Sequence, residues 1–438
     1  MRPELISILA LVACFAVATT MSVNMGVLAF AAAFLVGTLA GGLSDDEIFA
    51  GFPGDIFVVL VGVTYLFAIA RANGTTDWLV SWAVRLVGGR IAVLPWVMFG
   101  IGALLTAIGA VSPAACAIVA PVALNLAARH GISPLLMGAM VVHGTQAGGF
   151  SPISVYGVIV NGVVASNHLP GSPLVLFAGS FAVNLVIAGV VFAALGGLRL
   201  VRAGTPDGRG APAGQEALEG RGAPEGPGAA TAPVVGEGLR LNRDRLCTLL
   251  GLAGLVAATL GLGLDVGLVA MTVAVLLTLL SPKAAAGAAS EVTWPTVLLI
   301  CGVLTYVGVL REIGTIDYVG HAVAGVGVPL LAALLLCYIG GLVSAFASSV
   351  GLMGALIPLA VPFLNAGSVG AVGMVTALAV AATVVDVSPF STNGAIVLAN
   401  ARGVDREVFF RRLLGYGAVV TAAAPLAVWA VFVVPNLG

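Results

Sequence analysis

Residues 386–394 read DVSPFSTNG, and they interrupt a run of apolar sequence that is otherwise long enough to cross a membrane. The flanking segments, ALAVAATVV and AIVLAN, contain no charged residue. Unpaired backbone groups are costly in lipid, so irregular backbone persists at membrane depth only where it lines a cavity or is buried in protein. The stretch therefore predicts a polar site inside a membrane protein.

The composition of the whole chain supports a membrane location. Its 438 residues are 60% hydrophobic and only 8% charged, whereas a soluble domain carries about 25% charged residues. We expect an all-α polytopic protein of the inner (cytoplasmic) membrane, with the lipid bilayer as its surroundings. The net charge of −1 gives no indication of nucleic-acid binding, and the five cysteines and four histidines show no metal-ligand spacing. No cofactor or metal is expected apart from a coupling ion.

The two halves of the chain resemble each other. GVTYLFAIARANGTTDWL (62–79) matches GVLTYVGVLREIGTIDYV (302–319), and SPISVYG (151–157) matches SPFSTNG (388–394). The offsets are 240 and 237 residues. Two matches in the same order at nearly one offset indicate an internal duplication. For the same reason we expect the apolar N-terminal stretch to be the first membrane helix rather than a cleaved leader.

A linker divides the chain near its middle. The segment rich in Gly, Ala, Pro and Glu has no apolar periodicity, which predicts a flexible cytoplasmic loop over 201–244. The first repeat is then 1–200, and the second repeat is 245–438.

Each repeat is predicted to contain a re-entrant hairpin and a broken helix. The hairpins are expected at 91–130 and 328–365, and the broken helices at 133–163 and 368–400. An amphipathic stretch follows the third apolar segment in each half. The other apolar segments are predicted at 5–20, 24–42, 55–71, 174–199, 246–264, 266–281, 293–310 and 413–435. This gives about 10 transmembrane helices in addition to the hairpins.

The distribution of positive charge favours hairpins over full crossings. With re-entrant hairpins each half crosses the membrane an odd number of times, so the second half is inverted. If the central loop is cytoplasmic, all 18 Lys and Arg residues except Arg2 and Arg311 face the cytoplasm, as the positive-inside rule predicts. Full crossings would place residues 71–90 and the central loop on opposite sides.

Four breaks in the apolar pattern carry serine near proline or glycine. A helix that begins at mid-membrane presents free N–H groups and the positive end of its dipole, which favours an anion. We expect the breaks to meet and form a binding site. They are AVSPAA (110–115), GGFSPISVYG (148–157), FASSVG (346–351) and DVSPFSTNG (386–394). The candidate substrate-binding residues are Ser112, Ser151, Ser154, Ser349, Ser388, Ser391, Thr392 and Asn393. The alternative is that these are proline kinks whose hydroxyls only satisfy freed backbone groups.

Asp386 is the single acid in the interior of a predicted membrane-spanning segment, away from its ends. A charge at that depth is expensive and is usually functional. We expect Asp386 to bind a cation, either Na+ or a proton, together with Ser112 and Ser348. No arginine lies at a break, so an anion would be held by dipoles, hydroxyls and a co-bound cation. That arrangement predicts coupled symport.

Two further polar features lie near the breaks or at helix ends. His143 and Gln146 precede the first broken loop by a turn or two, and they either line the cavity or pack through hydrogen bonds. Two Arg–Asp pairs are predicted to be structural ion pairs at the membrane interface: Arg71 with Asp77, and Arg311 with Asp317.

These features resemble a known group of proteins. The layout is similar to that of the ion transporter superfamily, whose divalent-anion symporters have inverted repeats, hairpins and broken helices. The stretch GLSDDEIFAGFPGDIFVVLVGVTYLFAIARANGTTDWLV (42–80) resembles the N-terminal signature of MatC-type malonate/dicarboxylate carriers. The resemblance implies a permease for malonate, malate or succinate, driven by Na+ or H+. It also implies a homodimer that works by an elevator movement.

The hairpin tips depart from the pattern of the sodium symporters. Those proteins carry Ser-Asn-Thr at each tip, whereas the tips here read Val-Ser-Pro at 111–113 and Ser-Ser-Val at 348–350. The missing asparagines argue against Na+ binding in the manner of that family. Proton coupling through Asp386 therefore stays open.

Other functions fit the sequence less well. A cation/proton antiporter of the same superfamily would use Asp386 as its exchange residue, but antiporters usually carry more than one intramembrane acid. A membrane enzyme would need a cluster of acid/base or metal-binding residues, and the sequence shows none. A channel would not need matched hairpins. We therefore expect a secondary transporter for a small dicarboxylate rather than an enzyme.

Overall fold

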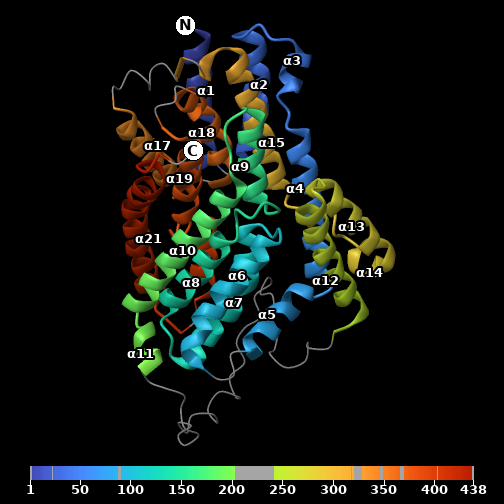
Figure 1. Cartoon of the computed structure of the whole chain (residues 1–438), viewed down its shortest axis with the longest axis vertical. Coiled ribbons are helices and arrows are strands. Elements are labelled where there is room, and N and C mark those ends of the chain that lie inside the picture. Colours follow the sequence, from blue (N-terminus) through green and yellow to red (C-terminus); the bar gives the residue numbers. More distant parts are fainter. Residues whose placement is uncertain are drawn as a thin grey trace, which may run out of the picture.

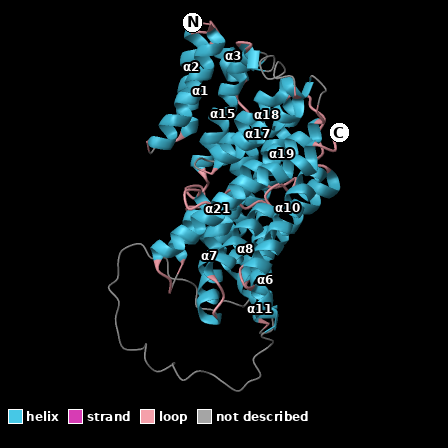
Figure 2. Ribbon diagram, turned by 90° about the vertical axis from the view of Figure 1, so that its left-hand side faces the viewer, coloured by secondary structure: helices cyan, strands magenta, loops and turns pink. Residues whose placement is uncertain are grey.

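The computed structural model shows an all-helical protein. It describes residues 2–21, 23–86, 90–202, 241–316, 318–319, 328–345, 349–365, 369–401 and 403–436. Within these residues there is no strand (Figure 2). Six of the described helices are long and apolar enough to span a membrane, which confirms the expected class. Most of the predicted loop at 201–244 lies outside the described residues, as does Ser348.

The helices of the two halves follow one another in a similar order (Figure 1). The first half contains α1 (Pro3–Thr20), α2 (Met25–Leu39), α3 (Asp45–Ala50), α4 (Gly54–Ala72), α5 (Thr75–Leu86), α6 (Leu94–Ala107), α7 (Ser112–His130), α8 (Pro134–Ala147), α9 (Val155–Ser166), α10 (Pro173–Ala194) and α11 (Gly197–Arg202). The second contains α12 (Arg243–Val256), α13 (Val266–Leu280), α14 (Pro282–Ala285), α15 (Trp294–Glu312), α17 (Pro329–Ser344), α18 (Ser349–Asn365), α19 (Ala371–Val384), α20 (Thr392–Asn400) and α21 (Arg406–Val428). The bounds of α4 and α15 differ by 240 residues at both ends.

The halves pack into each other rather than side by side. Helix α2 contacts α15, and α4 contacts α13. Each contact is a close crossing of two backbones at glycine. A Cβ on Gly302 would lie 2.0 Å from the Gly26 carbonyl oxygen, and one on Gly62 would lie 2.8 Å from the Gly267 carbonyl oxygen. Small residues allow membrane helices to approach this closely. Both of these contacts between the halves therefore depend on close helix packing at glycine.

Two helical hairpins lie toward opposite ends of the long axis (Figure 1). The α6–α7 hairpin lies in the part that contains α5 and α11, whereas α17 and α18 lie nearer the N-terminus. Helix α7 contacts both α8 and α20, and α18 contacts both α9 and α19. Each hairpin therefore packs against one segment of both broken helices.

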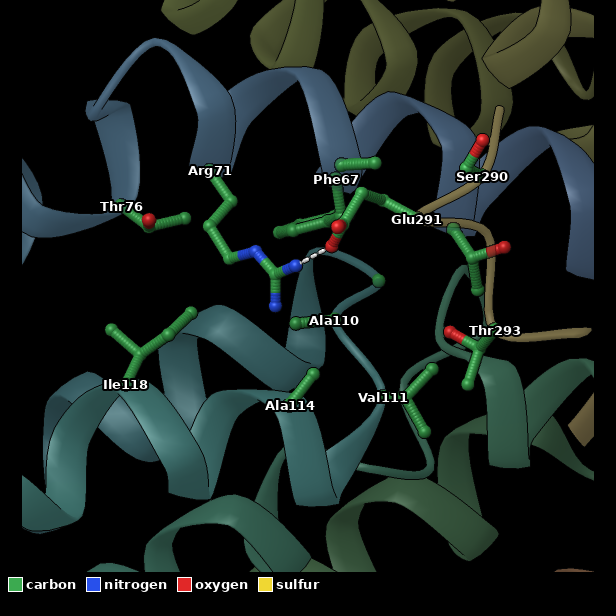
Figure 3. A pocket seen from close by; sticks show the side chains of 13 residues that line it. Phe67, Arg71, Thr76, Ala110, Val111, Ala114, Ile118, Ser290, Glu291 and Thr293 are labelled. Atoms are coloured by element: carbon green, nitrogen blue, oxygen red, sulfur yellow. Dashed lines mark hydrogen bonds and ion pairs between the residues drawn. The ribbon is translucent and has the colours of Figure 1, made fainter. Parts of the chain in front are cut away.

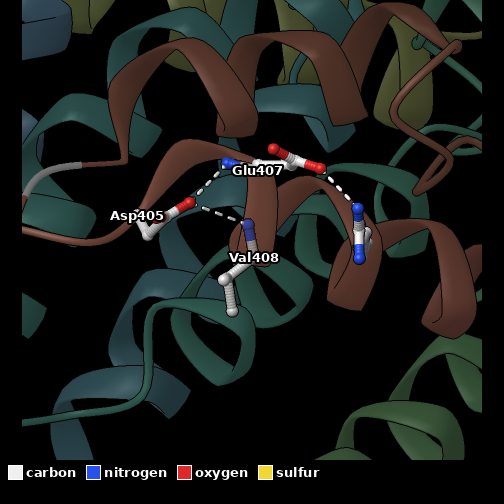
Figure 4. Close-up of polar contacts among 4 residues, drawn as sticks. Asp405, Glu407 and Val408 are labelled. Carbon is white, nitrogen blue, oxygen red and sulfur yellow. Dashed lines mark hydrogen bonds and ion pairs between the residues drawn. The ribbon is translucent and has the colours of Figure 1, made fainter.

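The last helix begins earlier than predicted, at Arg406 rather than at residue 413. Asp405 caps it, because its Oδ1 accepts hydrogen bonds from the backbone N–H groups of Glu407 at 2.9 Å and Val408 at 3.0 Å (Figure 4). Glu407 also forms an ion pair with Arg411 one turn on. A count of apolar residues misses a first turn made of charged ones, although the capping residue is readable in the sequence.

Candidate functional site

Both predicted broken helices are interrupted where the sequence indicates. Residues 148–154 separate α8 from α9, and residues 385–391 separate α19 from α20. The bounds of α8 and α19 differ by 237 residues at both ends, and the starts of α9 and α20 differ by the same amount. Ser154 and Ser391 are the N-cap residues of the second segments.

The two N-cap serines make the same local hydrogen bonds. Each accepts a hydrogen bond from the backbone N–H three residues on, at 3.2 Å for Ser154 and 3.3 Å for Ser391. Ser154 Oγ donates to the Ser151 carbonyl oxygen, and Ser391 Oγ donates to the Ser388 carbonyl oxygen, both at 2.7 Å. Both hydroxyls help to build the breaks, and Ser391 also lies within hydrogen-bonding reach of Asp386.

A glycine in the first turn after each break permits this tight geometry. A Cβ on Gly157 would lie 2.0 Å from the Ser151 carbonyl oxygen, and one on Gly394 would lie 1.9 Å from the Ser388 carbonyl oxygen. No larger residue fits at either position without moving the backbone. The shared Ser-Pro-x-Ser-x-x-Gly pattern is therefore the sequence form of one local structure, used twice.

Ser151, Ser349 and Ser388, three of the other predicted hydroxyls, bond to near neighbours in the sequence. Ser151 and Ser388 each accept a hydrogen bond from the backbone N–H two residues on, at 3.4 Å and 3.3 Å. Ser349, the first residue of α18, accepts a hydrogen bond from Ser344 at 2.7 Å. Thr392 is exposed. None of these four hydroxyls hydrogen-bonds to Asp386.

Asp386 lies in a buried group of polar side chains from both halves. Its Oδ2 accepts hydrogen bonds from Gln146 Nε2 at 3.0 Å and from Asn393 Nδ2 at 3.2 Å. Asn393 Nδ2 also donates to Ser112 Oγ at 2.9 Å, and Ser112 Oγ donates to Thr145 Oγ1 at 3.1 Å. All five side chains are at most 4% exposed. We call Ser112, Thr145, Gln146, Asp386 and Asn393 the central cluster.

Two amide oxygens of the central cluster have no partner. Gln146 Oε1 and Asn393 Oδ1 are buried and accept no hydrogen bond, although the great majority of buried polar atoms in proteins are paired. The nitrogens of the same two amides face Asp386. The cluster therefore has more acceptor oxygens than donors. Oxygen ligands of this kind suit a hard cation, and an excess of acceptors equally suits a proton on the carboxylate.

His143 belongs to a second polar chain that ends at the central cluster. Its Nδ1 lies 2.9 Å from Asn184 Oδ1, and its Nε2 lies 2.6 Å from the Tyr416 hydroxyl. Because Asn184 Oδ1 only accepts, Nδ1 carries a proton. Ser180 continues the chain, since it accepts from Asn184 Nδ2 through its carbonyl oxygen at 2.9 Å and donates to the Gln146 carbonyl oxygen at 3.2 Å. The sequence allowed each residue either to line the cavity or to pack through hydrogen bonds. His143 packs through hydrogen bonds, whereas Gln146 belongs to the central cluster.

The predicted ion pair of Arg71 with Asp77 is replaced by another. Arg71, in the last turn of α4, pairs with Glu291 from the loop before α15. Asp77 lies in the first turn of α5, which begins after a turn at Gly74 with φ +73°. It is attracted by Arg71, but the ion pair that Arg71 forms is with Glu291. Arg311 donates a hydrogen bond to Asn167, and its predicted partner lies outside the described residues.

Comparisons with known proteins give a family likeness for the first third of the chain and a similar fold for nearly all of it. Residues 1–149 match the family model described as the dicarboxylate carrier protein MatC N-terminus. The resemblance read from residues 42–80 is thereby confirmed. None of the curated proteins compared with the chain matches it.

A solved structure with the same fold is the YdaH transporter of Alcanivorax borkumensis. The TM-score is 0.61 at 14% sequence identity, and the alignment covers 98% of this chain and 98% of that chain. At this identity the likeness establishes the fold alone. Together with the six candidate spans, it identifies a multi-pass membrane protein with a transporter fold.

Proposed function

We propose that the protein is a secondary active transporter that imports a small dicarboxylate of the malonate, malate or succinate class, coupled to Na+ or H+. The observation that carries the proposal is the central cluster, in which Asp386 and two unpartnered amide oxygens are buried where the halves meet. The match of residues 1–149 to a dicarboxylate carrier supports the substrate class. The YdaH-like fold supports transport over enzymatic chemistry.

The proposed topology is an inverted repeat of about 10 transmembrane helices with two re-entrant hairpins. Three observations support it: the hairpins at opposite ends of the molecule, the two glycine crossings and the matching breaks. On this topology the central loop is cytoplasmic, and the protein lies in the inner membrane. A homodimer with an elevator movement remains part of the proposal through the resemblance to the dicarboxylate carriers.

The proposed cation site is Asp386 with the amide oxygens of Gln146 and Asn393. In the structure the amide nitrogens face the carboxylate. Rotation of each amide by half a turn exchanges its nitrogen and oxygen with little change in shape, and then presents oxygen to a bound Na+. A proton on Asp386 would serve the same purpose by removing the negative charge.

The proposed anion site adjoins the cation site at the start of α7. This helix begins at Ser112, and its N-cap residue Val111 supplies no side-chain hydrogen bond. Pro113 in the first turn carries no N–H group, so the N–H groups of Ser112 and Ala114 and the positive dipole end remain for a carboxylate. Neutralising Asp386 lowers the repulsion of a dianion at this position, which links binding of the cation to binding of the substrate.

Transport by purified protein in proteoliposomes tests this function. We expect uptake of labelled malonate or succinate when an inward Na+ gradient or an inward proton gradient is imposed, and little uptake with choline at equal pH on both sides. The gradient that drives uptake identifies the coupling ion.

The second candidate is a cation/proton antiporter that uses Asp386 as its exchange residue. The observation in its favour is the burial of this one carboxylate at 4% exposure. Sodium-driven proton movement in the same vesicles, without uptake of any dicarboxylate, would replace the first proposal by this one.

A further inference from the structure

A second polar site lies beside the tip of the α6–α7 hairpin. A cavity of about 300 Å³ is bounded by α4, the start of α5, the hairpin tip and the loop before α15 (Figure 3). Its polar lining includes Arg71, Thr76, Glu291 and Thr293. The volume is at the lower end of the range of small-molecule sites, which suits a ligand of a few carbon atoms.

Thr76 shows that the polar lining of the cavity is incomplete. The residue is only 2% exposed, and its Oγ1 has no hydrogen-bond partner. Buried hydroxyls are almost always paired in folded proteins. A ligand oxygen in the cavity would complete the bonding of this hydroxyl.

Arg71 supplies the positive charge of the cavity. Its guanidinium reaches between α4 and the hairpin and meets Glu291 there (Figure 3). Both side chains are about half exposed, at 50% and 54%, so their ion pair adds little and is exchangeable. Burial raises the pKa of Asp77 against the attraction of Arg245 and Arg71, and the ion pair of Arg71 is with Glu291.

The hairpin tip is the partition between this cavity and the central cluster. Gly109 and Val111 line the cavity, and the next residue, Ser112, bonds to Asn393 in the central cluster. Gly109 has φ +122°, and a Cβ there would lie 2.7 Å from Val63 Cγ1. The tip is thus held tightly against α4. Among the described residues no arginine or lysine donates a hydrogen bond to the central cluster. The cavity, in contrast, is lined by Arg71.

We propose that this cavity is a second, transient site for the transported dicarboxylate. In it Arg71 exchanges Glu291 for a carboxylate of the ligand, and Thr76 donates a hydrogen bond to the same ligand. The identity of the ligand rests on the proposed function. On the proposed topology Arg71 faces the cytoplasm, so the site holds the substrate after it leaves the central cluster.

Kinetics measured separately on the two sides of the membrane test the inference. In proteoliposomes of defined orientation, the KM for succinate or malonate is measured from the cytoplasmic and from the external side. We expect Arg71→Gln to raise the cytoplasmic KM about tenfold and Thr76→Val to raise it about threefold, with the external KM unchanged. Glu291→Gln should lower the cytoplasmic KM about threefold, because it frees the guanidinium. Arg311→Gln is the matched control outside the cavity, and it should leave the cytoplasmic KM unchanged.

Each outcome decides the inference. An unchanged cytoplasmic KM in both Arg71→Gln and Thr76→Val would overturn it and leave the proposed function standing. Absence of dicarboxylate transport by the wild-type protein would instead overturn the proposed function, and this inference with it. Thr76→Val gives a reading even if Arg71→Gln does not fold, because the variant removes a hydroxyl that has no partner.

Discussion

Replacing Asp386 by asparagine should separate the stability of the protein from its response to a cation. The carboxylate is 4% exposed and belongs to neither ion pair of the described residues. It accepts two amide hydrogen bonds, each worth about 1.5–3 kcal/mol to a charged acceptor and about half of that to a neutral one. The substitution therefore removes about 1.5–3 kcal/mol of hydrogen bonding. It also removes the desolvation penalty of a buried charge, which is several kcal/mol.

These terms predict that Asp386→Asn is at least as stable as the wild type when no coupling cation is present. With the cation at 100 times its Kd, the wild type should gain about 2.7 kcal/mol and the variant should gain nothing. Thermal unfolding of purified protein in NaCl and in choline chloride, each at several pH values, measures both effects. If the proton is the coupling ion, Na+ will shift neither protein and acidification will stabilise only the wild type.

Asp405→Asn is the matched control for the loss of one carboxylate. Asp405 caps α21 at an exposed position, and asparagine caps a helix equally well. This control should keep the full response to the cation. An Asp386→Asn protein that also keeps that response would refute the cation site. A variant that unfolds several degrees below the wild type in choline would show instead that the carboxylate is a structural anchor.

Three further predictions concern the breaks and the helix caps. Gly394→Ala and Gly157→Ala should each lower stability by about 1–3 kcal/mol, because the new Cβ meets a backbone oxygen at 1.9 or 2.0 Å; unchanged melting temperatures would contradict the tight turns. Ser112→Ala should weaken substrate binding about tenfold in a titration, since it bonds within the central cluster. Ser151→Ala should change affinity less than about twofold, because that hydroxyl bonds only within its own turn. Equal losses of affinity in the two variants would argue against placing the substrate beside Ser112. Asp405→Ala should cost about 1 kcal/mol of stability where asparagine costs nothing, and a melting curve equal to the wild type would show that the cap is not used.

The sequence by itself determined the class of the protein and the position of the breaks. Long apolar segments indicate membrane helices because lipid leaves no water for backbone groups. The two Ser-Pro-x-Ser-x-x-Gly stretches determine where α8 and α19 stop, since the capping serine and the required glycine lie within one turn of each other. The start of α21 was misplaced only because its capped first turn is charged.

Only the tertiary structure decided which polar side chains face one another. In the sequence the serines of the four breaks look alike, yet Ser112 bonds to Asn393 in the central cluster whereas Ser154 bonds only within its own break. Gln146 donates to Asp386 across 240 residues of chain, and no local pattern specifies that pairing. The physical reason is that a hydroxyl or amide bonds to whatever lies within about 3 Å. That neighbour is set by how the hairpin packs between the two broken helices.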